Sequence, residues 1–224
     1  MSPILYTGII GLAMVIAVAC ALKLFDINSD FSPLIRKVSV PLAIIISVLN
    51  VFVFAMPIVD EYFDLGVFSS TIFVSCLAYF IIGYALSVCI DAIMAKQNNK
   101  KKAKPAVVPL TLLDLLGGIL AGFGLGACFF SNGIGILAAV AIGLFLIIEK
   151  AAIVFRYQGN WTRKQIISNL AITLLVIPII AACVIWLTGS NVQIGTIMLA
   201  LGCGYLLYRS AFHLFFIAKS YKKS

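Results

Sequence analysis

Glu149 and Lys150 place an acid and a base side by side within an otherwise apolar run, AIGLFLIIEKAAIV at residues 141–154. Burying a charged side chain in hydrocarbon costs about 3 kcal/mol or more, so charges at such positions are expected to be paired or functional. Neighbouring positions on a helix diverge by about 100°, which prevents these two side chains from facing the same neighbouring helix. Each therefore needs a partner of its own, and the carboxylate could accept a proton or bind a cation.

Counting outward from the expected turn gives a candidate partner for Lys150. Helices at 109–130 and 133–157 would form an antiparallel hairpin that turns near Asn132, and this arrangement brings Asp114 level with Lys150. We predict that Lys150 pairs with Asp114 across the hairpin, or that its long side chain extends to the inner membrane surface.

Glu149 is expected to face the helix that follows. Asn169 and Thr173 are level with it when the count is made about the loop near Asn160, and both side chains could hydrogen-bond its carboxyl group. Two interpretations remain open. These groups fix the register of the helices, since breaking a buried pair is costly, or Glu149 is the proton- or cation-accepting group of a pathway open to the cytosol.

The composition identifies the environment of the helices that carry these residues. The chain of 224 residues is 63% hydrophobic and 11% charged, with a mean hydropathy of +1.16, which excludes a water-soluble domain with one core. Runs of about 20 apolar residues can cross the hydrocarbon layer of a bilayer. They predict an all-α, polytopic membrane helix bundle of about seven transmembrane helices, split at SNG and TGSN, over residues 4–24, 38–58, 67–95, 109–130, 133–157, 165–188 and 193–217.

Loop charge predicts the orientation of these helices, because cytoplasmic loops carry an excess of Lys and Arg. The connections after the first, third and fifth helices and the C-terminal tail are basic, whereas the second connection carries only acidic charges. The N-terminus is therefore expected outside and the C-terminus in the cytosol. The net charge of +8 is interpreted mainly as this topology signal rather than as a patch for nucleic acid.

One compositional break divides the chain, which is expected to form a single membrane domain over residues 1–224. The sequence KQNNKKKAK lies in a basic cytosolic loop at 96–108, between a three-helix part at 1–95 and a four-helix part at 109–224. The loop is too short to be a domain of its own. No soluble module is therefore expected to carry enzymatic chemistry.

Small residues and prolines mark two of the predicted helices. Gly118, Gly122 and Gly126 recur at every fourth position of the fourth helix, a spacing that lets neighbouring helices approach closely. We expect this helix to be central and buried, and we favour packing over a role in binding or gating. Pro57 and Pro178 permit kinks in the second and sixth helices. Such prolines often flank a substrate site in transporters, but proline is also common in membrane helices generally. Both interpretations remain open.

Catalytic and cofactor motifs do not occur in this chain. It has no HExxH, GxSxG or P-loop sequence and no nucleophile with a neighbouring base, so it is not expected to be an enzyme or to need a cofactor. A retinal protein would need a Lys in the middle of the seventh helix, which has none. The cysteines lack CxxC spacing, and we expect them to be small buried hydrophobes. They are Cys20, Cys76, Cys89, Cys128, Cys183 and Cys203.

Several stretches resemble the ZIP family of divalent-metal transporters. GFGLGACFFSNGIGILAAVAIGLFLIIEKAAIVFRYQGNWTRKQII, at 122–167, is similar to that family's fourth and fifth helices with their short outer turn. VFAMPIVDEYF at 53–63, GYALSVCIDAIM at 83–94 and LALGCGYLLYRSAFHLFF at 199–216 resemble its second, third and seventh helices. A basic variable loop after helix three, with the N-terminus outside, also fits. The resemblance implies a transporter scaffold.

The ligands of the family's metal site are mostly replaced. Its HNxxDG-like stretch on helix four corresponds to GGILAG at 117–122, and its H[EN]xPEG-like stretch on helix five to FLIIEK at 145–150. Only Glu149 remains among those ligands, Ile177 stands where helix six has a Glu, and the eighth helix has no counterpart. We therefore expect no metal site, because glycine or apolar residues hold the other positions: Gly117, Gly118, Ala121, Phe145 and Leu146.

Two classes of function remain. The first is an integral membrane transporter-like protein with a ZIP-like scaffold that moves a small cation or solute after losing most of its metal site. The second is a non-catalytic membrane subunit or pseudo-transporter of a larger membrane complex. A hydrated pathway would favour the first class, and a bundle closed by Phe, Leu and Ile would favour the second.

The expected environment is the lipid bilayer, with several passes through a plasma or inner membrane. The expected partners are a small cation or solute for the first class, and a membrane protein or a second copy of the chain for the second. Nucleic acid is not expected as a partner.

Overall fold

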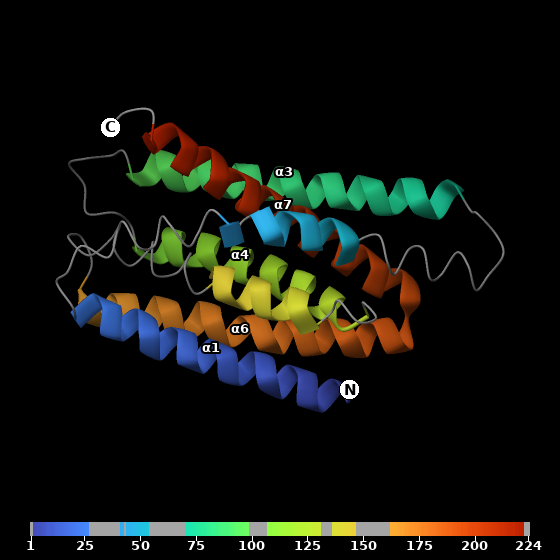
Figure 1. Ribbon diagram of the computed structural model, residues 1–224, viewed down its shortest axis with the longest axis horizontal. Coiled ribbons are helices and arrows are strands. Elements are labelled where there is room, and N and C mark those ends of the chain that lie inside the picture. Colours follow the sequence, from blue (N-terminus) through green and yellow to red (C-terminus); the bar gives the residue numbers. More distant parts are fainter. Residues whose placement is uncertain are drawn as a thin grey trace.

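The computed structural model describes residues 2–26, 41–42, 44–53, 70–98, 107–130, 136–146 and 162–221. Within these ranges the regular structure is helical throughout, without a strand (Figure 1). The helices are α1 (Pro3–Asp26), α3 (Ser70–Asn98), α4 (Val107–Cys128), α6 (Arg163–Ser190) and α7 (Val192–Tyr221), with shorter apolar helical segments at Ile44–Val53 and Ile136–Leu146. These seven segments lie on the seven apolar runs of the sequence, which confirms the all-α prediction.

Three of the described helices are long and apolar enough to cross a membrane. They cover Val74–Ile93, Lys164–Gly189 and Ile194–Phe212. Large apolar side chains also lie on the outer surface of the bundle, among them Ile4 at 84% exposed and Trp186 at 72%. Such a surface suits a protein surrounded by lipid. Seven spans and the orientation of the two termini stay predictions.

The directions of the labelled helices fall into two groups. In Figure 1, α1, α3 and α7 begin at one end of the bundle, and α4 and α6 begin at the other end. Contacts between α3 and α7 agree, because Gly83 lies against Leu201 and Asp91 against Arg209, so the two helices run in parallel. The reversals from α3 to α4 and from α6 to α7 are those of a chain that crosses a layer repeatedly.

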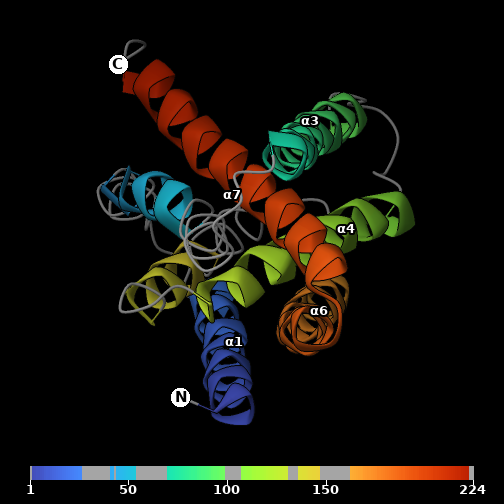
Figure 2. The same ribbon diagram turned by 90° about the vertical axis from the view of Figure 1, so that its right-hand side faces the viewer.

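α4 lies at the centre of the bundle, as its glycines predicted. A Cβ atom added to Gly122 would lie 2.8 Å from the Cβ of Ile180 on α6, and one added to Gly126 would lie 2.8 Å from the Cβ of Val184. On another side, Gly124 packs against Leu206 of α7. Figure 2 shows α7 crossing α4, with α3 and α1 on opposite sides of the bundle. The glycines therefore let two helices approach α4 closely, which is the packing role that the sequence favoured.

The ends of α6 follow from local hydrogen bonds. At its N-terminus, the Thr162 hydroxyl accepts from the Gln165 backbone amide and the Gln165 side chain accepts from the Thr162 amide, which is a capping box. At its C-terminus, the Asn191 amide donates to the Leu187 carbonyl, while the Asn191 side chain accepts from the Ile194 amide at the start of α7. Asn191 thus ends one helix and caps the next, which confirms the predicted split at 188–191.

Tyr6 ties α1 to the C-terminal end of α4. The Phe129 amide donates to the Gly126 carbonyl rather than to the Leu125 carbonyl, as at the tightened end of a helix. The Tyr6 hydroxyl donates to this Leu125 carbonyl over 2.9 Å, and its ring meets that of Phe129 edge to face at 5.4 Å. α4 ends at Cys128, and the predicted break at 131–133 lies outside the described residues.

One detail of the sequence prediction is wrong. The helical ends of α3 and α7, at Asn98 and Tyr221, lie a few residues past their apolar runs, because residues such as Lys96 and Lys219 favour helix without being apolar. Cys89 and Cys183 are exposed on the outer surface rather than buried, because lipid-facing positions of a membrane helix are as apolar as core positions. Among the described side chains, Cys76, Cys128 and Cys203 are buried as expected.

Candidate functional site

The structure describes only some of the site residues that were predicted from the sequence. Asn169 is buried in α6. Asp114 lies in α4 and Thr173 in α6, but their side chains are outside the described part, and so are Glu149 and Lys150 altogether. The pairing of Asp114 with Lys150 and the hydrogen bonds to Glu149 therefore stay predictions.

The positions that align with the metal ligands of the ZIP family form part of the apolar core. Ala121, Phe145, Leu146 and Ile177 are all buried and belong to one hydrophobic cluster. Gly117 faces the Tyr205 hydroxyl of α7, which lies 2.7 Å from the place of an added Cβ. In the described ranges, no three His, Cys, Asp or Glu side chains come together as a metal would require. Apolar side chains therefore surround most of these positions, with the Tyr205 hydroxyl beside Gly117.

A charged pair links α3 and α7. The Arg209 guanidinium donates from Nη1 to Asp91 Oδ1, and each side chain is 14% exposed. The guanidinium carbon also lies 6.0 Å from the ring centroid of Tyr205, within reach of a cation–π contact. The second carboxylate oxygen, Asp91 Oδ2, is buried without a hydrogen-bond partner among the described residues. The ion pair therefore satisfies one of the two carboxylate oxygens, and the Tyr208 side chain on α7 also interacts with the Asp91 carboxylate.

Aromatic rings lie beside this charged pair. Tyr84 of α3 meets Tyr208 of α7 edge to face at 5.2 Å, and Tyr208 stacks on Phe212 at 5.6 Å. Tyr208 and Arg209 are neighbours in sequence, so the rings and the guanidinium leave α7 at the same height. The amphipathic rings suit the boundary between hydrocarbon and headgroups. The ends of the spans at Ile93 and Phe212 agree with that position.

A second group of polar contacts joins α7 to the helical segment Ile44–Val53. The Asn50 side-chain amide donates to the Cys203 carbonyl, and the Ser47 hydroxyl donates to the Ser210 hydroxyl over 2.7 Å. Asn50 is only 1% exposed, yet its Oδ1 has no partner in the described part of the chain. The fully buried Ser87 hydroxyl on α3 has none there either.

We call these polar residues the α7 seam, because each lies on α7 or on a described helix beside it. Buried polar groups in proteins are nearly always hydrogen-bonded, and those that are not often bind water or an ion. The open acceptors of the seam are oxygens, the ligand type that suits protons and hard cations. The α7 seam comprises Ser47, Asn50, Ser87, Asp91, Arg209 and Ser210.

Sequence reasoning missed the α7 seam although it carried a signal. Asp91 and Arg209 are opposite charges inside the apolar runs at 67–95 and 193–217, each near the end that loop charge assigns to the cytosol. The predicted topology makes those two runs parallel. Pairing charges at the same end of parallel helices would have nominated both residues.

Comparison of the chain with family models, with curated proteins and with solved structures gives no match.

Proposed function

We propose that this chain is a multi-pass integral membrane protein of the transporter type, which moves a proton or a small hard cation along the α7 seam. The observation that carries the proposal is Asp91, an acid inside an apolar helix whose Oδ2 is buried without a partner in the described part. A charge at such a position is costly and marks an ion or proton pathway by default. Arg209 donates to the other carboxylate oxygen, Oδ1.

Further oxygens of the α7 seam support this proposal. Asn50 Oδ1 and Ser87 Oγ are also buried and have no hydrogen-bond partner in the described ranges. They belong to different helices beside α7, so they would form separate binding sites along α7 rather than one coordination site. Several weak oxygen sites favour passage over tight binding, since an ion must leave as well as enter.

The resemblance to the ZIP family enters the proposal as scaffold alone. The core positions of that family's metal site hold buried Ala121, Phe145 and Ile177, so the proposed cargo follows another route. Glu149, the remaining ligand-type residue, would serve as a second acidic group on the cytosolic side. Asn169 and Thr173 would hydrogen-bond its carboxyl group, and Lys150 would pair with Asp114, as predicted from the sequence.

A second candidate function is a non-catalytic subunit or pseudo-transporter in a larger membrane complex. It is favoured by the closed core, where the largest fully buried side chains include Leu125, Ile142, Phe145, Leu146 and Leu206. These large apolar side chains pack together in one hydrophobic cluster of the described residues, as in a closed bundle. In this candidate the α7 seam fixes helix register, and a membrane protein or a second copy covers the outer surface.

Transport by the purified chain in liposomes distinguishes the two candidates. Flux of protons, Na⁺, K⁺ and Mg²⁺ would be measured with internal dyes, for the natural chain and for Glu149→Gln. Flux of at least one ion that falls about tenfold in the variant supports the transporter. Liposomes that carry folded protein and leak no faster than empty ones support the subunit instead. A plasma or inner membrane is the proposed location in either case.

A further inference from the structure

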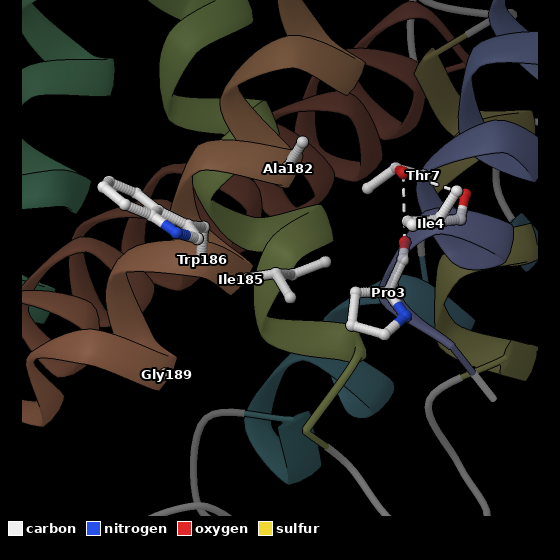
Figure 3. Close-up of a pocket in the computed structure, with 7 residues that line it drawn as sticks. All are labelled: Pro3, Ile4, Thr7, Ala182, Ile185, Trp186 and Gly189. Carbon is white, nitrogen blue, oxygen red and sulfur yellow. Dashed lines mark hydrogen bonds between the residues drawn. The ribbon is translucent and has the colours of Figure 1, made fainter.

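A groove of about 530 Å³ lies between the first turns of α1 and the last turns of α6. Figure 3 shows Ile185 of α6 pointing toward Pro3 and Ile4 of α1, while the Trp186 ring points away from α1. The side chains of the lining are apolar apart from the Thr7 hydroxyl and the Trp186 indole N–H. The walls are Pro3, Ile4 and Thr7 on α1, and Ala182, Ile185 and Trp186 on α6.

The single hydroxyl of the groove is already satisfied. Thr7 Oγ1 donates within its own helix, 3.0 Å from the Pro3 carbonyl and 3.1 Å from the Ile4 carbonyl (Figure 3). Its methyl group therefore remains to contact an occupant. Apart from the Trp186 indole N–H, the side chains of the lining offer no free polar group, so the groove suits an apolar occupant better than a sugar or a nucleotide.

The position of the groove along the span points to lipid. Gly189 is the last residue of the span Lys164–Gly189 and also lines the groove. The groove therefore lies in the outer turns of a membrane-spanning helix and opens where hydrocarbon meets headgroups. Trp186 flanks it one turn from the end of the span, as aromatic residues do at this boundary.

Charge selects the kind of lipid. α1 has no acidic residue in its first turn, and α6 has no basic residue in its last turn. None of the residues that line the groove is charged. No basic side chain of the lining would therefore attract an anionic headgroup, and we take a zwitterionic lipid as the occupant.

We propose that the groove between α1 and α6 holds one acyl chain of a zwitterionic phospholipid as a retained ligand. The proposal rests on the membrane location of the chain and does not require transport. A lipid could remain bound to a chain that moves no ion, so failure of either proposal is distinguishable from failure of the other.

Two glycines offer a matched pair of variants. A Cβ added to Gly189, inside the groove, would meet no atom within 4 Å, and the same is true of Gly8 on α1, which does not line the groove. Gly189→Leu would place a side chain where the acyl chain is proposed to lie. Gly8→Leu adds the same side chain to the surface of α1 and leaves the groove open.

Native mass spectrometry of the full chain tests the proposal. The natural chain and both variants would be reconstituted with equal phosphatidylcholine and phosphatidylglycerol, extracted in mild detergent and washed free of loose lipid. We expect one phosphatidylcholine retained per chain in the natural protein and in Gly8→Leu, and at least a fivefold lower bound fraction in Gly189→Leu. Equal retention in both variants, or retention of phosphatidylglycerol instead, overturns the proposal.

Fluorescence places the retained lipid. In a Trp161→Phe background, Trp186 is the remaining tryptophan, and a retained phosphatidylcholine with brominated acyl chains should quench its emission. Quenching should be lost in Gly189→Leu and kept in Gly8→Leu. A dimer of natural chains that becomes monomeric in Gly189→Leu, without any retained lipid, would assign the groove to a second copy and overturn the proposal.

Discussion

Asp91 on α3 and Arg209 on α7 form an ion pair between two helices that run in the same direction and are far apart in the sequence. Close backbone contacts frame the pair, because Gly83 packs on Leu201 and Gly204 packs on Phe80. Small residues bring the two helices together, and the charges fix how far one slides along the other. The pair is thus a structural element as well as the proposed ion contact.

Exchanging the two charges tests the structural part of this account. Asp91→Arg alone and Arg209→Asp alone each put like charges together and should lower the free energy of unfolding by about 3 kcal/mol, as for a broken buried pair. The double variant should recover most of the loss in a thermal unfolding assay in detergent. A double variant no better than either single variant means that the two side chains do not meet.

Tyr6 should stabilise the contact of α1 with α4 through its hydroxyl. Tyr6→Phe keeps the ring against Phe129 but removes the donor to the Leu125 carbonyl, so we expect a loss of about 1 kcal/mol. Tyr6→Leu also removes the ring contact and should lose more. Equal stability of the natural chain and Tyr6→Phe would exclude a role for the hydrogen bond.

Gly202 should tolerate no side chain. A Cβ at this position would overlap the backbone nitrogen of Gly124 on α4, so Gly202→Ala should lower stability by about 3 kcal/mol through overpacking. Gly8→Ala is the control, because a Cβ there has no neighbour within 4 Å and alanine favours helix. The yield of monodisperse protein in detergent measures both, and similar yields would contradict the close crossing of α4 and α7.

The topology predicted from loop charge can be tested by labelling. In a cysteine-free background, an impermeant maleimide added outside should label a cysteine at Asp64 or Ser190 and not one at Lys101. Pro3 and Gly189 line the same groove. A cysteine at Ser2 should therefore be labelled from the same side of the membrane as one at Ser190. Labelling of Lys101 from outside would reverse the proposed orientation.

The positions of the helices could be predicted from the sequence because hydropathy determines them directly. The turn at Asn191 was predictable for the same reason, since polar residues interrupt an apolar run there. The central place of α4 followed from the spacing of Gly118, Gly122 and Gly126. In each case the signal is local and lies within one helix or one turn.

The α7 seam could not be reached by the same reasoning. The sequence analysis matched residues at the same height only within hairpins of consecutive helices. Asn50 and Cys203 belong to helices that are distant in sequence, and so do Asp91 and Arg209. Which distant helices touch depends on close approach at small residues such as Gly83 and Gly204, and composition does not reveal that pairing. Cys89 and Cys183 show a related limit, because hydropathy does not separate a core-facing position from a lipid-facing one.

Asp91 is proposed to carry ions or protons along the α7 seam. The flux of protons or cations into liposomes would be measured for equal amounts of the natural chain, Asp91→Asn and Cys89→Ala. Cys89→Ala is the control, because Cys89 is exposed on α3. Asparagine keeps the size of the side chain and removes its charge, so folding can be checked by gel filtration before reconstitution. We expect flux reduced at least tenfold in folded Asp91→Asn and unchanged in Cys89→Ala. Undiminished flux in folded Asp91→Asn would show that Asp91 does not carry the transported ion or proton.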